Sequence, residues 1–371
     1  MQKELEFDQI TYGKDGILVE NKNKIKTLRI NEGDFQKRLT EINETYQIIR
    51  DSHTGRAFEI AIVNKHRLMD GAILMPSTSF SSLTQNRGNA IELAAHGAAT
   101  SDAARVYVAF PGMGGSSSLS RQDRQYLAEK GRFTQNGKAL DSISALVSAL
   151  DSNNISIKSI SANAEGGRLA LGIMAALPSD SVNSVYLNGL PGIYSLSNDT
   201  WISVTIIGQF KIRIKRRTKE SDQEDSQEMY KVSALRLEEA KSSLPNIYRG
   251  LRYLTRLSRT YLRAMPNMAA YTEAFNRHDD LQSVSEHAVL QDALAALSSQ
   301  KKARVTFQFN KRGRLHDNLD KCKKFGQTLT EELSKTPFQG SVQFFVYDGS
   351  LDFHTSYPSR RWAIEKDALM L

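Results

Sequence analysis

The sequence predicts an α/β protein built on a mostly parallel sheet with helices on both faces. Short apolar runs of strand length alternate with segments of helical periodicity from about residue 105 to residue 187. The same alternation returns between Arg304 and Tyr347, and the stretch between these two regions is largely helical and rich in charge. Such alternation is typical of parallel strands joined by crossover helices. We therefore expect one sheet domain that is interrupted by a helical insertion.

The strands are expected where apolar runs are bounded by turn residues. These runs are 58–63, 72–75, 106–110, 155–160, 182–187, 304–309 and 342–347. The helices are expected where apolar residues recur every three or four positions, as they do across Ala139–Leu150. The other helices expected on this basis are 34–50, 89–98, 164–177 and 319–333.

The length of 371 residues fits one large α/β domain with one sizeable insertion. We expect an N-terminal arm over residues 1–57 and a sheet domain formed by residues 58–194 and 303–371. Residues 195–302 are expected to form a mainly helical cap.

Composition restricts the class of protein. Apolar residues make up 40% of the chain and charged residues 24%, which is ordinary for a globular protein and excludes wholesale disorder. The single cysteine, Cys322, excludes an internal disulfide framework and a cysteine-based metal site. The acidic N-terminus lacks the pattern of a signal peptide, and no apolar run is long enough to span a bilayer. We expect a cytoplasmic protein that needs neither a cofactor nor a metal ion.

One pentapeptide, Ala162-Asn-Ala-Glu-Gly166, joins an expected strand directly to an expected helix. It places small residues on both sides of Ala164, in the pattern small-x-Ala-x-small. A sharp strand-to-helix turn holds its central residue in a strained conformation that tolerates only small neighbours. An ordinary turn made of small residues is the alternative. Ser161 is a poorer centre for such a turn, because Ser159 and Asn163 flank it badly and the pair Gly166-Gly167 is then unexplained.

A glycine-rich loop, Pro111-Gly-Met-Gly-Gly-Ser116, follows the strand expected at 106–110. By itself such a loop is also compatible with a phosphate-binding loop or a plain turn. A polar segment, Tyr347-Asp-Gly-Ser-Leu-Asp-Phe-His354, follows the last expected strand. Asp317 is the only carboxylate in the loop that follows the preceding expected strand, 304–309.

Taken together, these segments resemble the α/β-hydrolase superfamily of serine esterases and lipases over about residues 58–194 and 303–371. The resemblance implies an α/β-hydrolase fold with Ala164 at the position of the nucleophile, Asp317 as the triad acid and His354 as the triad histidine. Asp348 and Asp352 are rival acids, and Asp317 could instead cap the helix that follows it.

The glycine loop resembles the His-Gly-x-Gly-Gly loop of lipases and esterases, with Pro111 in place of the histidine. The resemblance implies that the amides of Met113 and Glu165 form an oxyanion hole, and that Gly112 and Gly114 contact the substrate. The implied reaction is cleavage of an ester, thioester or amide of a small acyl substrate through an acyl-enzyme.

The chain departs from this pattern at the nucleophile, because alanine cannot attack a carbonyl. An engineered serine-to-alanine change would leave the glycines, the glycine loop and His354 in place, as the sequence has them, and we favour it. The alternative is a natural pseudo-hydrolase that binds a ligand or partner without turnover.

The net charge of +8 is concentrated in one segment of the expected cap. Residues Thr205–Arg263 contain 14 lysines and arginines against 7 acids, a net charge of +7. A solvated helix face explains this as well as contact with an anionic, lipid-like substrate or a membrane surface does. Since no nucleic-acid motif accompanies the basic residues, we expect no nucleic-acid partner.

Overall fold

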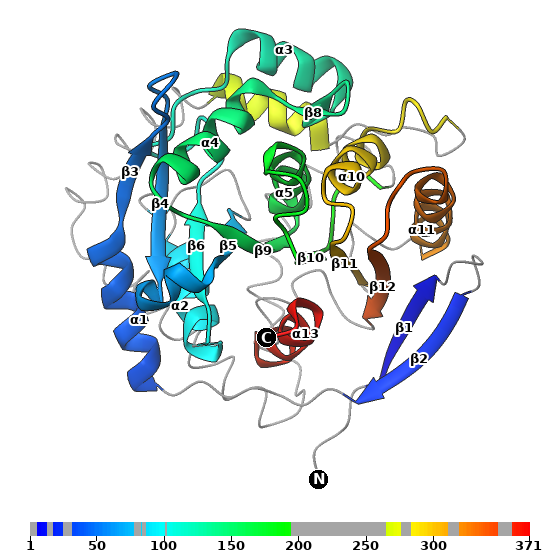
Figure 1. Cartoon of the computed structure of the whole chain (residues 1–371), viewed down its shortest axis with the longest axis horizontal. Helices are drawn as coiled ribbons and strands as arrows, with labels where there is room; N and C mark the ends of the chain where they lie inside the picture. The colour runs from blue at the N-terminus through cyan, green and yellow to red at the C-terminus, as the bar shows by residue number, and fades with distance from the viewer. Residues whose placement is uncertain are drawn as a thin grey trace, which may run out of the picture.

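The computed structural model describes residues 6–12, 18–24, 32–77, 83, 87–100, 102–193, 265–275, 283–310, 319–347 and 358–371. They form one ten-stranded sheet in the order β2-β1-β12-β11-β10-β9-β5-β6-β4-β3, shown in Figure 1. The strands are β1 (Glu6–Tyr12), β2 (Leu18–Lys24), β3 (Gln47–Arg50), β4 (Ala57–Val63), β5 (Ala72–Pro76), β6 (Ala104–Val108), β9 (Ile157–Asn163), β10 (Ser184–Asn188), β11 (Arg304–Asn310) and β12 (Ser341–Tyr347). A separate small hairpin pairs β7 (Thr134–Gln135) with β8 (Lys138–Ala139).

The centre of the sheet is parallel. From β6 through β5, β9, β10 and β11 to β12, every pair of neighbours runs in the same direction. Antiparallel pairing is confined to the two sides of the sheet, where β4 joins β6 and the β1–β2 hairpin joins β12. The carboxyl ends of β5, β9, β10, β11 and β12 therefore lie along one edge, and the predicted α/β class is confirmed.

Helices cover both faces, as Figure 1 shows. One face carries α3 (Arg121–Lys130), α4 (Asp141–Ser152), α5 (Glu165–Ala176), α10 (Ala288–Ser299) and α11 (Leu319–Ser334). The opposite face carries α1 (Glu32–Thr45), α2 (Arg87–Ala99) and α13 (Pro358–Leu369). A short 3₁₀ helix, η1 (Lys65–Asp70), links β4 to β5.

The two faces of the sheet differ in chemistry. Toward α5 and α10 the strands present apolar side chains such as Ile160, Leu187 and Phe307, which belong to the largest core cluster. Toward α2 and α13 the alternate positions are largely polar and nevertheless buried. This polar face consists of Glu59, Arg105, Tyr107, Ser159, Ser161, Asn163, Ser184, Tyr186, Asn188, Thr306 and Gln308. Burying so many polar groups is costly unless they bond to one another.

A buried ion pair fixes α10 to α5 on the apolar face. Arg168 Nη2 lies 3.0 Å from Asp292 Oδ2, and both side chains are fully buried. The Asp292 carboxylate also accepts hydrogen bonds from the backbone amides of Phe133 and Thr134 and from the Thr134 hydroxyl. Burial raises the pKa of Asp292, although Arg168 and these hydrogen bonds act in the opposite direction.

We expect Asp292→Leu to lower the free energy of unfolding by about 3–5 kcal/mol, because it leaves Arg168 charged and unpaired in the core. Chemical denaturation followed by circular dichroism measures this loss. The double variant Asp292→Leu, Arg168→Leu should recover part of it, and Asp367→Leu on an exposed position of α13 should change little. Equal losses for Asp292→Leu and Asp367→Leu would contradict this account.

Most predicted elements are present, but the expected helix over 34–50 ends at Thr45 and continues as β3. Ile49 is buried there because β3 pairs antiparallel with β4, and this pairing outweighs helical periodicity. Two helices and five strands were not expected as separate elements, namely α3, α13, β1, β2, β3, β7 and β8.

The expected domain boundaries also shift. Residues of the expected N-terminal arm supply β1, β2 and β3 to the main sheet, so the boundary at residue 58 cuts through β4. The expected cap includes α10, which instead packs on α5 inside the sheet domain. The basic segment Thr205–Arg263 lies outside the described residues.

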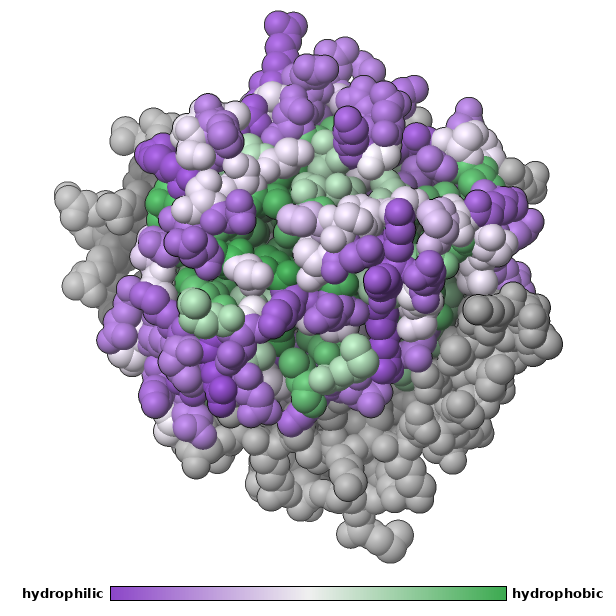
Figure 2. All heavy atoms as spheres, in the orientation of Figure 1, coloured by the Kyte–Doolittle hydropathy of each residue, from purple (hydrophilic) through white to green (hydrophobic). Residues whose placement is uncertain are grey.

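The visible surface of the described chain is mostly hydrophilic, with apolar side chains showing through in the middle of the view in Figure 2. Large hydrophobic side chains are exposed at Ile48, Met69, Met265 and Met370. Within the described ranges, no helix has the length and apolar character required to cross a membrane.

Candidate functional site

Ala164 occupies the turn between β9 and α5 with φ 43° and ψ −125°. A positive φ is uncommon for a residue that carries a β-carbon, and it costs roughly 1–3 kcal/mol. The backbone around it holds this conformation: the Ala164 amide donates to the Asn188 carbonyl at the end of β10, and its carbonyl accepts from Gly167. The sequence-predicted elbow, Ala162–Gly166, is therefore present as a sharp turn at the carboxyl edge of the sheet.

The neighbours of Ala164 must be small for steric reasons. A β-carbon at Gly166 would lie 2.6 Å from the carbonyl oxygen of Ser77 and 2.9 Å from that of Pro76. At Gly167 it would lie 2.7 Å from Leu190 Cδ1, and Ala162 is fully buried. The helix thus begins in direct contact with the end of β5, which explains the small-x-Ala-x-small pattern physically.

We expect Ala164→Gly to leave stability unchanged or raise it by up to about 1 kcal/mol, because glycine adopts positive φ without strain. The matched control is Ala170→Gly inside α5, which should lower stability by about 1 kcal/mol or more because glycine weakens helix interiors and leaves a small cavity. Urea titrations of both variants measure the difference. Equal destabilisation by the two changes would mean that Ala164 is not strained.

Polar side chains join the ends of the central strands beside the elbow. Asn163, Asn188 and Gln308 stand opposite one another in the register of β9, β10 and β11. Asn188 Nδ2 donates to Asn163 Oδ1 over 3.2 Å, and the Tyr186 hydroxyl donates to Gln308 Oε1 over 2.6 Å. These side chains are buried, so they brace the strand ends rather than line an open surface.

Glu165 is the first residue of α5 and retains part of its surface. Burial raises the pKa of its carboxyl group to about 7, while a hydrogen bond with its own backbone acts in the lowering direction. A carboxyl group that titrates near neutrality directly after Ala164 makes the charge of this edge dependent on pH. The predicted use of the Glu165 amide as an oxyanion donor depends on that amide being released from its own side chain.

The raised pKa gives a prediction for stability. Between about pH 4.5 and pH 7 the folded state holds the Glu165 proton and the unfolded chain releases it, so rising pH lowers stability across this interval. We expect Glu165→Gln to remove that loss, giving a variant more stable by about 1–2 kcal/mol at pH 8 and equal to the parent near pH 4. Thermal unfolding at both pH values measures it, and a pH-independent difference would contradict the assignment.

The glycine loop requires a correction. In the α/β hydrolases that the sequence resembles, the oxyanion amide that complements the elbow comes from the loop after the third strand. The β1–β2 hairpin lies beyond β12 at the other side of the sheet, so the strands are counted from β3. The third strand is then β5, which pairs with β9, and the loop after it starts at Ser77. The predicted loop follows β6 instead, one strand further from the elbow. The amide of Met113 donates to the Phe110 carbonyl over 3.0 Å, so it is not available to an oxyanion.

Helix 265–275 covers the glycine loop, in which Gly112 and Gly114 were predicted to contact the substrate. Gly112 and Gly114 adopt positive φ, and a β-carbon at Gly112 would collide with the side chain of Asn267. The Tyr271 hydroxyl donates to the Pro111 carbonyl over 3.0 Å. Gly112 therefore serves the turn and its close packing against the helix, and Gly114 serves the turn through its positive φ.

The predicted triad partners Asp317 and His354 lie outside the described residues, as do Asp348 and Asp352. Their segments follow β11 and β12, whose carboxyl ends share the edge that holds Ala164. At about 4.8 Å between neighbouring strands, those ends lie roughly 10 and 14 Å from the end of β9. Among the described residues, no group of three His, Cys, Asp or Glu side chains could hold a metal ion.

A set of ionic residues on the polar face was not predicted from the sequence. Glu92 and His96 on α2, Arg105 on β6 and Glu365 on α13 meet behind the elbow. The spacing of Glu92 and His96, four residues apart in a helix, is the only sequence pattern that pointed toward such a contact.

No protein-family model matches the sequence, and the search of curated proteins gives no match. Similar solved structures include an α/β-hydrolase enzyme from a Medee basin deep-sea metagenome library, 13% identical over 88% of this chain and 98% of that chain, with a TM-score of 0.48. An esterase from a Rhodococcus species is 12% identical over 88% and 98%, with a TM-score of 0.46. An epoxide hydrolase from Vigna radiata is 12% identical over 87% and 98%, with a TM-score of 0.44.

The strand order and the turn at Ala164 identify an α/β-hydrolase fold. This defines the class of protein by its architecture, and leaves its reaction to the residues at the carboxyl edge.

Proposed function

We propose that the chain is the nucleophile-less form of a serine hydrolase that cleaves an ester, thioester or amide of a small acyl substrate. One observation carries the proposal: Ala164 keeps φ 43° and ψ −125° between Ala162 and Gly166. Glycine would remove the strain, so a β-carbon at this position is retained at a cost in stability. A serine-to-alanine replacement accounts for that, because it removes only the hydroxyl group.

In the proposed reaction, a serine at position 164 attacks the carbonyl carbon and passes its proton to His354, which Asp317 orients. The leaving group then takes the proton from His354, and water hydrolyses the acyl-enzyme with the same histidine as base. The negative oxygen of each tetrahedral intermediate rests on backbone amides, one of them that of Glu165. The loop that begins at Ser77 replaces the glycine loop as the expected source of the second amide.

The charge of the Glu165 carboxyl group affects the proposed oxyanion site. An ionised carboxylate beside the elbow would repel the developing oxyanion, whereas the neutral acid would not. Because the pKa of Glu165 is raised to about 7, we expect this repulsion to set in as the pH rises through neutrality. The net charge of +7 on the segment Thr205–Arg263 favours anionic or lipid-like acyl substrates.

The test is the variant Ala164→Ser with p-nitrophenyl esters of different acyl lengths as substrates. We expect turnover that the parent chain lacks, with kcat/KM at least about 10³-fold above it, because the nucleophile supplies much of the rate enhancement of such enzymes. Initial rates at 405 nm measure it.

Two further variants control this test. Ala164→Ser, His354→Ala should lose the turnover, while Ala164→Ser, Ser161→Ala should keep it, since Ser161 is buried within β9 two residues from the end of the strand. The proposal would be overturned if the Ala164→Ser revertant were as inactive as the parent on every ester, thioester and amide tried.

A second candidate is a non-catalytic module that binds a ligand or partner on the hydrolase fold. It is favoured by the Met113 amide, which bonds to Phe110 rather than facing the elbow, and by the alanine itself. This candidate predicts that the revertant stays inactive and that calorimetry with short acyl carboxylates gives the same affinity for the parent and for His354→Ala. Turnover by the revertant decides against it.

A further inference from the structure

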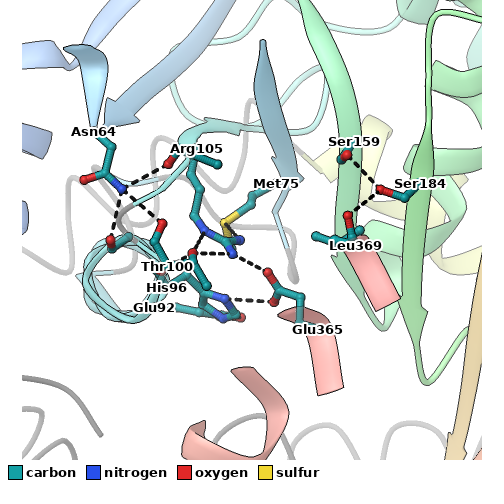
Figure 3. Close-up of polar contacts among 12 residues, drawn as sticks. Asn64, Met75, Glu92, His96, Thr100, Arg105, Ser159, Ser184, Glu365 and Leu369 are labelled. Carbon is teal, nitrogen blue, oxygen red and sulfur yellow. Dashed lines mark hydrogen bonds and ion pairs between the residues drawn. The ribbon is translucent and has the colours of Figure 1, made fainter. Parts of the chain in front are cut away.

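A chain of buried contacts runs from the elbow to the C-terminal helix on the polar face. Asn163, the residue before Ala164, donates through Nδ2 to Glu92 Oε1 over 3.0 Å. The same oxygen lies 3.9 Å from His96 Nε2, one turn further along α2. The other ring nitrogen, His96 Nδ1, lies 2.9 Å from Glu365 Oε2 on α13. The contacts of His96 and Glu365 are drawn in Figure 3.

Arg105 is the last residue in this series of contacts, beyond Glu365. Its Nη2 lies 2.5 Å from Glu365 Oε1, and its Nε and Nη2 donate to the Thr100 hydroxyl at the end of α2 (Figure 3). His96, Arg105 and Glu365 are each at most 1% exposed. Glu365 thus contacts both Arg105 and His96, and Glu92 contacts both His96 and Asn163.

Stability alone does not explain why these ionic residues are buried together. A buried ion pair is a weak way to stabilise a fold, since well-packed apolar residues often do as well. Its advantage is a defined geometry, because each buried charge has one arrangement that satisfies it. Here the arrangement links β9 at the elbow, α2, β6 and α13. The last turn of α13 is also tied to the sheet, where the Leu369 carbonyl accepts from Ser184.

We propose that Glu92, His96 and Glu365 form a positioning relay that sets the backbone of the elbow relative to α13. Glu92 holds Asn163, His96 holds Glu92 in place, and Glu365 holds His96 from the C-terminal helix. The helix α13 begins at Pro358, four residues after His354 in the sequence. The relay itself rests on the described contacts, and only its effect on turnover rests on the proposed function.

Hydrogen exchange of the parent chain tests the relay without activity. The probe is the Ala164 amide, which donates to the Asn188 carbonyl. We expect Glu92→Leu and Glu365→Gln each to raise its exchange rate roughly tenfold or more, because the elbow loses a tether to α2 or α13. Glu92→Gln keeps an acceptor oxygen for Asn163 and should stay within about threefold of the parent.

Two controls separate positioning from general loss of stability. Asp367→Asn makes the same change of charge on the exposed side of α13 and should leave Ala164 exchange unchanged. The Gly131 amide, at the end of α3 on the opposite face, should also exchange at the parent rate in every variant. A rise at Gly131 equal to that at Ala164, or no rise at Ala164 in Glu92→Leu, would overturn the relay.

Activity gives a second readout in the Ala164→Ser background. We expect Glu92→Leu to lower kcat about 10- to 100-fold with KM nearly unchanged, and Glu92→Gln to restore most of it, because a misplaced nucleophile slows chemistry more than binding. An inactive revertant that still shows the exchange pattern would refute the proposed function and leave the relay standing. The relay would be refuted if Ala164→Ser is active and adding Glu92→Leu changes neither its kcat nor the exchange rate of the amide at position 164.

Discussion

The turn at Ala164 is the constraint on which the rest of the structure depends. The strand β9 becomes the helix α5 within one residue, Ala164, which adopts φ 43°. The consequence is steric: the first turn of α5 meets the carbonyls of Pro76 and Ser77, which only a glycine at position 166 permits. Its position is set by the sheet, because the Ala164 amide is bonded to the end of β10. The strain at Ala164, a residue with a β-carbon, is the observation on which the proposed position of the nucleophile rests.

The division of the sheet into an apolar and a polar face explains how this turn is held. Packing of α5, α10 and their neighbours against the apolar face supplies the burial of hydrophobic surface that stabilises the fold. On the opposite face, hydrogen bonds and ion pairs between α2, α13 and the strand ends take the place of part of the apolar packing. Such contacts are worth less for stability, but they define positions more narrowly.

Much of the fold follows from local sequence patterns. The α/β class, the central strands and the elbow at Ala162–Gly166 were all predicted, because periodicity and small residues are local properties. The β1–β2 hairpin and α13 were missed, since their placement depends on strand pairing and on Glu365 meeting His96 across 269 residues of chain. The glycine loop was assigned to the wrong strand for a related reason: β5 and β6 exchange places in the sheet, and no local pattern reveals that exchange. Asp317 and His354 remain predictions.

We propose above all that the atom missing from Ala164 is a nucleophile. The most direct measurement treats the Ala164→Ser protein with a fluorophosphonate and locates the adduct by peptide mass spectrometry. We expect a single adduct on the serine introduced at position 164, absent from the parent chain and lost when His354→Ala is added. An adduct at Ser161 or at another hydroxyl, or no adduct in a revertant that is folded, would contradict it.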